Sequence, residues 1–196
     1  MGDNIPVKRG HFVNLTSAIN RMFALLPRFC IRFIYSVTRN INGKIGLGLR
    51  YVTLKQLMKH CGSNVAIFPN VIIKHPEQLE IGDNVSIHPF CYIDALGGIR
   101  IANDVSIAHN CSIISFNHTW IDMQTPIKYN EIEKNPISIS NDVWLGCGVR
   151  VIGPCNIESR TVIAAGAVAK GNLSGGALYG GVPAKIIKTI TPPPDN

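Results

Sequence analysis

The feature that most constrains the fold is a repeat of six residues between Val65 and Ala169. A second small or branched residue stands two positions before each recurring aliphatic residue, as Val65 stands before Ile67. A repeat of this regularity indicates a chain built from stacked structural units. The recurring positions hold Ile67, Ile73, Ile81, Ile87, Ile93, Ile101, Ile107, Ile113, Ile139, Leu145, Val151, Ile157, Ile163 and Ala169.

A period of six fits neither a helix nor a continuous strand. Residues two apart point to the same face of a strand, so each unit is one short strand. The polar and glycine residues that follow, as in Ile81-Gly-Asp-Asn84, supply a turn. Units of this kind bury a continuous aliphatic column when they stack, which predicts an all-β solenoid, a parallel β-helix.

The interruptions of the repeat predict the shape of a coil. The spacing grows to eight between Ile73 and Ile81 and between Ile93 and Ile101, and it grows much further after Ile113. These breaks fall at every third unit, which predicts about five triangular coils with all insertions at one corner. Residues 114–136 then form one extruded loop. Long loops in compact folds are commonly functional, so we expect the chemistry near this loop.

The flanking segments do not repeat. Residues 1–60 are predicted to form an N-terminal helical extension, residues 61–190 the solenoid domain, and residues 191–196 a frayed tail. Thr53 is expected to cap a short helix over residues 54–60. We expect the extension to plug the open end of the solenoid; a basic amphipathic face turned to the inner membrane is a second interpretation that is compatible with the first. The sequence has no apolar run long enough for a transmembrane helix.

The composition of the chain indicates which kinds of partner it can bind. The formal net charge of +7 favours anionic partners, yet no basic run interleaved with aromatic residues indicates nucleic acid. A charged content of only 16% suggests that further apolar surface is buried between subunits. Of the six cysteines, Cys91, Cys111 and Cys155 fall on inward positions and are expected to be structural. Reduced cysteines and the absence of a signal peptide favour the cytoplasm.

Among the six histidines, His118 is the candidate catalytic residue, because it lies at the base of the extruded loop. An imidazole with a pKa near neutral is suited to general-base catalysis. His75 and His88 fall at corners of the coils and are expected to be solvated.

Three segments carry a resemblance to a known family. These are Ile139-Ser-Asn-Asp-Val-Trp-Leu-Gly-Cys-Gly148, Ala164-Ala-Gly-Ala-Val168 and Gly180-Gly-Val-Pro-Ala-Lys185. In this order they resemble the hexapeptide-repeat, left-handed β-helix acyltransferases. The chain is most similar to maltose, galactoside and nodulation-type O-acetyltransferases, and especially to the acetyltransferases of O-antigen and capsule biosynthesis. The left-handed sense of the coils comes from this resemblance alone.

The resemblance implies a homotrimer with active sites between subunits, acetyl-CoA as the acyl donor, no metal, and a carbohydrate acceptor. His118 would take the proton of the acceptor hydroxyl, and the N–H of Cys147 would donate to the oxyanion. Asp94 aligns with a family asparagine and would either orient His118 or bind the acceptor. Asn117 and Trp144 would also bind the acceptor. The residues implied for the donor are Gly146, Cys147, Ala165, Gly166, Lys170, Lys185 and Lys188.

The sequence therefore predicts an acetyl-CoA-dependent O-acetyltransferase that acts on a sugar hydroxyl of a surface polysaccharide or its precursor. The alternative is an N-acetyltransferase of an amino sugar or an antibiotic on the same fold. A more remote alternative is a zinc γ-carbonic anhydrase, because His88, His109 and His118 follow one another on successive coils.

Overall fold

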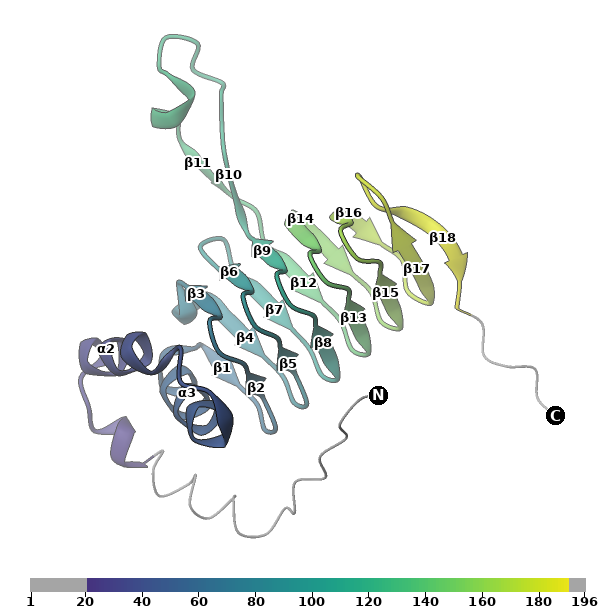
Figure 1. Ribbon diagram of the computed structural model, residues 1–196. Helices are drawn as coiled ribbons and strands as arrows, with labels where there is room; N and C mark the ends of the chain where they lie inside the picture. The colour runs from purple at the N-terminus through teal and green to yellow at the C-terminus, as the bar shows by residue number, and fades with distance from the viewer. Residues whose placement is uncertain (1–20, 191–196) are drawn as a thin grey trace, which may run out of the picture.

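The computed structural model describes residues 21–190 and shows a parallel β-helix with helices at one end and an arm projecting from its side (Figure 1). The predicted starting residues of the extension and the predicted frayed tail lie outside the described residues. Its coils have three sides, and each side is a ladder of short parallel strands. The solenoid and its triangular coils, predicted from the repeat, are confirmed.

Successive strands along the chain belong to the first, second and third sides in turn. The first side consists of β1 (His60–Cys61), β4 (Leu79–Ile81), β7 (Ile99–Ile101), β12 (Ile137–Ile139) and the later halves of β14 (Arg150–Ile157) and β16 (Val168–Leu173). The second side consists of β2 (Ala66–Ile67), β5 (Ser86–Ile87), β8 (Val105–Ile107), β13 (Val143–Leu145), β15 (Thr161–Ile163) and β17 (Ala177–Gly180). The third side consists of β3 (Ile72–Lys74), β6 (Tyr92–Asp94), β9 (Ser112–Ile114) and the earlier halves of β14 and β16.

The register places the six-residue repeat in vertical columns. On the second side, Ile87 pairs with Ile107, which lies below Leu145 and then Ile163. These four side chains are 0% exposed. Fully burying one such side chain contributes about 1.5–3 kcal/mol, so the columns supply much of the driving force for folding. The predicted inward cysteines are also buried, and burial raises the pKa of the Cys155 thiol to about 12.

The corners of the triangle differ in what they carry. We call the corner between the first and second sides corner I, the corner between the second and third sides corner II, and the corner between the third and first sides corner III. At corner I a ladder of side-chain amides and carboxylates links successive coils, as in Asn64 Nδ2 to Asn84 Oδ1 and Asn84 Nδ2 to Asp104 Oδ1, both 2.9 Å. Polar residues repeat at this corner because the side chains of each turn form hydrogen bonds with those of the next turn.

Corner III holds all three insertions, as the spacing predicts. They are residues 75–78, which include the short helix η1 (Pro76–Gln78), residues 95–98, and residues 115–136. The longest one forms the arm, in which β10 (Phe116–His118) pairs with β11 (Ile132–Lys134) and η2 (Ile127–Tyr129) lies near the tip. In Figure 1 the arm extends well away from the coils.

At the other end of the chain, β18 (Lys185–Thr189) turns back antiparallel to β17 and closes the second side. The N-terminal end of the solenoid is covered by α2 (Arg28–Thr38) and α3 (Gly43–Leu57) (Figure 1). The Tyr35 hydroxyl donates to the Val71 carbonyl at 2.8 Å, and Leu54 joins the core of the first coil.

The expected helix over residues 54–60 is wrong. α3 begins eleven residues earlier, at Gly43, and ends at Leu57, while His60 already belongs to β1. Thr53 lies inside α3, where its hydroxyl donates to the Leu49 carbonyl at 2.7 Å. A hydroxyl satisfied by the preceding turn is compatible with a helix interior, so a threonine alone does not mark a helix start.

Arg50 on α3 joins the helices to the first coil. Its side chain is 1% exposed, and its Nε donates to the Ile67 carbonyl at 2.7 Å. Its Nη1 donates to the carbonyls of Ile41, at 2.6 Å, and Arg39, at 3.4 Å. One guanidinium therefore satisfies the end of a coil strand and the end of the α2–α3 connection together.

We predict that Arg50→Met lowers the free energy of unfolding by about 3 kcal/mol, because it leaves buried carbonyls without a donor. Urea unfolding followed by circular dichroism measures this loss. The matched control is Arg160→Ala, which breaks an exposed ion pair with Asp142 and should cost less than about 1 kcal/mol. An Arg50→Met protein as stable as the control would contradict the assigned role.

Candidate active site

The candidate catalytic residue His118 lies at the end of β10, opposite Ile132 of β11. Its imidazole is exposed to solvent and meets the ring of Phe116 edge-on, with 6.3 Å between the ring centroids. Among residues 21–190, no group forms a hydrogen bond or ion pair with the His118 ring. The arm therefore presents a free imidazole, and this chain alone provides no partner that orients it.

Asn117, the residue before it, anchors the arm. Its side-chain amide donates to the carbonyl of Gly153 at 2.9 Å, and Gly153 lies at corner III of the next coil. The amide nitrogen thus has a structural role, and the predicted contact with the acceptor rests on the side-chain oxygen.

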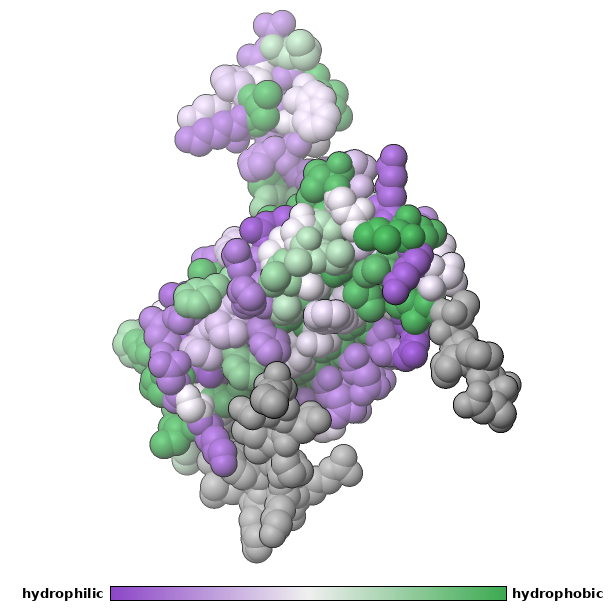
Figure 2. All heavy atoms as spheres, turned by 45° about the vertical axis from the view of Figure 1, so that its right-hand side comes forward, coloured by the Kyte–Doolittle hydropathy of each residue, from purple (hydrophilic) through white to green (hydrophobic). Residues whose placement is uncertain are grey.

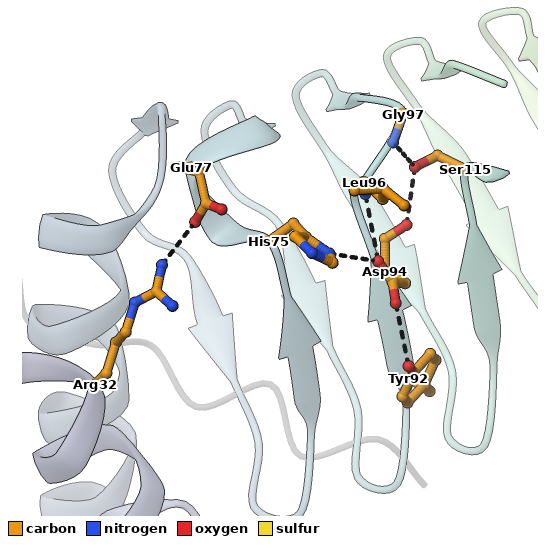
Figure 3. Close-up of polar contacts among 8 residues, drawn as sticks. All are labelled: Arg32, His75, Glu77, Tyr92, Asp94, Leu96, Gly97 and Ser115. Atoms are coloured by element: carbon orange, nitrogen blue, oxygen red, sulfur yellow. Dashed lines mark hydrogen bonds and ion pairs between the residues drawn. The ribbon is translucent and has the colours of Figure 1, made fainter. Parts of the chain in front are cut away.

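Within the described residues of this chain, Asp94 does not contact His118 and pairs with another histidine. Its carboxylate is buried, and its Oδ1 lies 2.8 Å from Nδ1 of His75 (Figure 3). The same carboxylate accepts from the Tyr92 hydroxyl at 3.2 Å and from the Leu96 N–H at 3.3 Å. Partial burial and the negative charge of Asp94 raise the pKa of Tyr92. The pairing arises because the residue before His75, Lys74, is in register with Asp94 on the adjacent coil.

His75 lies at a corner and its side chain is 41% exposed, but its ring is also paired with a buried carboxylate, a contact that the sequence analysis did not predict. The sequence carried a signal for this contact. His75 and Asp94 are 19 residues apart, close to the 20-residue register of the neighbouring strands.

Small residues stack at corner II, as the predicted donor site requires. The Gly146 N–H donates to the Ile163 carbonyl at 2.8 Å, and the Gly166 N–H donates to the Cys147 carbonyl at 2.9 Å. A Cβ on Gly146 would lie 2.7 Å from the Ala165 nitrogen, so only glycine fits there. Cys147, Ala165 and Gly166 are exposed and form a narrow strip of small side chains.

Cys147 also offers an unused donor. Its neighbours Gly146 and Gly148 both donate their N–H groups within the coil stack. Within the described part of the chain, the N–H of Cys147 has no acceptor. An exposed backbone N–H without a partner can donate to a developing oxyanion.

The three predicted phosphate-binding lysines are all exposed but do not lie together. Lys185 is nearest to corner II, because the N–H of its neighbour Ala184 donates to the Val168 carbonyl at 2.8 Å. Lys170 lies further along the chain towards corner III, and Lys188 lies along β18 opposite Leu178. Trp144 points outward from the second side and is 53% exposed, away from Asp94 at corner III.

Two further histidines lie at corner II, below Cys147. The His88 ring stacks on Phe68, with 4.8 Å between the centroids, so its predicted solvation is wrong. Burial and the nearby His109 lower the pKa of His88. The His109 carbonyl accepts the Gly148 N–H at 3.0 Å. No three His, Cys, Asp or Glu side chains between residues 21 and 190 are grouped to hold a metal ion.

Most of the predicted site residues fall into two groups, whereas Trp144, Lys170 and Lys188 lie outside both. The proton acceptor and the acceptor-binding residues His118, Asn117 and Asp94 gather at corner III and its arm. The small residues predicted for the donor lie at corner II, at the opposite end of the third side, with Lys185 nearest to them. A single chain does not bring the two groups together.

Comparison with known proteins places the chain in a family. No family model matches the sequence. The Saccharomyces cerevisiae protein YJL218W, named as an acetyltransferase, is 31% identical over 139 residues, which cover 70% of this chain and 69% of that protein. The chain belongs to the hexapeptide-repeat acetyltransferase family.

Other relatives are also named as acetyltransferases. An acetyltransferase of Mycobacterium tuberculosis, Rv3034c, is 33% identical over 61% of this chain. The matched segment covers only 40% of the length of Rv3034c. WbbJ of Escherichia coli K12, named as a lipopolysaccharide biosynthesis O-acetyl transferase, is 30% identical over 54% of this chain and 58% of its own. The structure of a galactoside acetyltransferase in complex with coenzyme A superposes with a TM-score of 0.74, covering 84% of this chain and 80% of that one at 21% identity. The left-handed β-helix fold that the resemblance predicts is the fold of these acetyltransferases.

Proposed function

We propose that this protein is an acetyl-CoA-dependent O-acetyltransferase that acts on a sugar hydroxyl of a surface polysaccharide or its precursor. The observation that carries the proposal is the free, exposed imidazole of His118 at the base of the arm. The family membership and the name of the relative WbbJ support the reaction and the acceptor class.

His118 acts as the general base. A sugar hydroxyl is a weak nucleophile at neutral pH, and a positioned base accelerates its attack by about 10²- to 10⁴-fold. The imidazole takes the hydroxyl proton while the hydroxyl oxygen attacks the thioester carbonyl directly. The unpartnered N–H of Cys147 donates to the carbonyl oxygen as negative charge develops on it. The CoA thiolate leaves, and the proton held on His118 becomes available to it.

The small-residue strip at corner II fits the pantetheine arm of the donor. Gly146, Ala165 and Gly166 present no side chain larger than a methyl group, so an extended chain can lie against the backbone. Lys185 lies beside the strip and supplies a positive charge for a phosphate. Lys170 and Lys188 meet the phosphates only if the nucleotide end reaches further along the solenoid.

The separation of the two groups supports a homotrimer with active sites between subunits. The arm of one chain brings His118 to corner II of the next, where the donor strip lies. Such closed cyclic assemblies use one patch against a different patch of the neighbour.

Exposed apolar side chains support the same assembly. The arm carries large hydrophobic residues that are at least 62% exposed: Trp120, Ile121, Met123, Ile127 and Tyr129. Phe90 at corner II and Val182, Ile186 and Ile187 near the C-terminal end are at least 58% exposed. Figure 2 shows hydrophobic side chains gathered on the side that carries the last coils. Surfaces of this kind are normally covered by a partner, and a second copy with the complementary patch meets the requirement.

We predict that His118→Ala lowers the rate of acetyl transfer by about 10²- to 10⁴-fold while acetyl-CoA binding is retained. Thiol release with a panel of sugars measures transfer, and a thermal-shift titration with acetyl-CoA measures binding. His60→Ala, a change at another exposed histidine, is the control and should transfer at the wild-type rate.

Wild-type transfer by His118→Ala would contradict the role of the base. A panel in which only amino sugars accept the acetyl group would replace O-acetylation by N-acetylation on the same site.

We further propose that α2 holds the protein on the cytoplasmic side of an anionic membrane. No helix between residues 21 and 190 is long and apolar enough to span a bilayer. One face of α2 is nonetheless open and apolar, because Phe29, Phe33 and Val37 are 72%, 67% and 58% exposed at successive turns. Ile31 and Tyr35 on the opposite face pack inward.

Charge favours a bilayer over an apolar protein partner. From Asn4 to Pro76 the sequence has 11 Lys and Arg residues and no Asp or Glu. An amphipathic helix with apolar side chains and basic surroundings binds at the interface of anionic lipids.

We predict that the double change Phe29→Ser and Phe33→Ser lowers binding to phosphatidylglycerol vesicles at least about tenfold, because apolar burial supplies part of the affinity. Co-sedimentation measures binding, and Ile187→Ser at the far end of the solenoid is the control. A wild-type protein that remains in the supernatant with these vesicles would contradict the membrane proposal.

A further inference from the structure

The cluster of His75, Asp94 and Tyr92 at corner III has no role in the reaction as proposed so far (Figure 3). The side chain of Asp94 is 8% exposed, whereas that of His75 is 41% exposed. A buried carboxylate is thus covered by an imidazole that still reaches solvent.

The cluster contributes little that an apolar pair would not contribute to the fold. Burying a carboxylate costs free energy that its partners must offset, and apolar residues of similar volume are often neutral or stabilising in such places. The equivalent position on the next coil, Ile114, is aliphatic and in register with Asp94. The coil geometry therefore accepts an apolar residue where this chain has a carboxylate.

The hydrogen bonds fix the state of the imidazole. An ionised carboxylate only accepts hydrogen bonds, so a neutral His75 must carry its proton on Nδ1 and donate it to Asp94. Its Nε2 then has a free lone pair. A buried carboxylate that sets the tautomer and angle of a half-exposed histidine is the arrangement found where an imidazole must meet a ligand. His118 has no such support.

The cluster is also tied to the arm. The Asp94 carbonyl accepts both the N–H of Ser115, at 3.1 Å, and its hydroxyl, at 2.9 Å. Ser115 is the first residue of the insertion that carries His118. His75 lies on the first complete coil and Ser115 on the third. With strands about 4.8 Å apart, their backbone levels are separated by about 10 Å along the axis.

One pyranose ring is too small to span that separation. We propose that the acceptor is a glycan of at least two sugars, and that Nε2 of His75 accepts a hydrogen bond from a hydroxyl of the sugar next to the one that is acetylated. This inference rests on the proposed function and adds a specificity-determining residue to it. Asp94 is then a positioning residue that acts through His75.

Two readouts test the inference apart from the proposed function. The first needs no turnover: nitrogen NMR of the imidazoles, with the His75 signal assigned by its loss in His75→Asn, should show the Nδ1–H tautomer in the neutral form of the ring. In Asp94→Asn this preference should weaken. An Nε2–H tautomer in the wild type would overturn the inference even for an active enzyme.

The second readout is the ratio of kcat/KM for a disaccharide to that for the matching monosaccharide, starting with methyl lactoside and methyl galactoside. The wild type should prefer the disaccharide at least about tenfold. His75→Asn keeps a donor to Asp94 but lacks the distal nitrogen, so it should lose this preference through KM while its monosaccharide and acetyl-CoA kinetics stay unchanged. Glu77→Gln, in the same insertion, breaks only an exposed ion pair with Arg32 and is the control that should keep the preference.

A wild type without disaccharide preference, or a His75→Asn protein that keeps it, would overturn this inference alone. Absence of transfer to every mono- and disaccharide in the screen would overturn the proposed function and this inference with it. Melting temperatures of His75→Asn and His75→Ala show whether the cluster only joins the coils. In that case His75→Ala would melt earlier while His75→Asn keeps the wild-type sugar preference.

Discussion

The whole structure depends on keeping every coil in register with the next. The N–H groups of the strands must meet carbonyls of the neighbouring coil, and each inward aliphatic residue must pack on the one below it, as Ile101 packs on Ile81. A coil of fixed length can gain residues only where the extra chain leaves the stack. Corner III is that place, and the His75–Asp94 cluster and the arm both lie there.

This constraint explains how much the sequence could predict. The aliphatic period, the turn residues and the position of the insertions report directly on the stack, so the solenoid, its sides and the arm follow from them. α3 was harder to predict, because its three glycines resemble turns and Thr53 resembles a cap. Gly46 is required by a close approach of the Ile41 carbonyl, a tertiary contact that no local pattern shows.

In the candidate site, too, some contacts follow from the repeat and others do not. The stacking of Gly146 on Ala165 follows from small residues at equal repeat positions. The partner of Asp94 follows less directly, because His75 lies inside an insertion and is 19 rather than 20 residues from Asp94, so the pair is recognised only once the insertion is placed in space. His88 differs, because it follows Ile87 as Phe68 follows the paired Ile67, so the stacking of the two rings was present in the regular repeat and was missed. The residues whose side chains point out of the stack are those for which sequence reasoning is weakest.

The proposed mechanism requires that His118 and the donor strip come from different chains. Ala165 is exposed and small, so Ala165→Phe should block the strip without disturbing the core, whereas His118→Ala removes the base. The direct measurement is acetyl transfer by a mixed assembly of these two inactive variants, co-expressed with different tags and purified through both. In such an assembly, some sites combine the intact arm of one chain with the intact strip of another. We therefore expect the mixed assembly to recover part of the wild-type rate. A mixed assembly that stays as inactive as each variant alone would contradict the account.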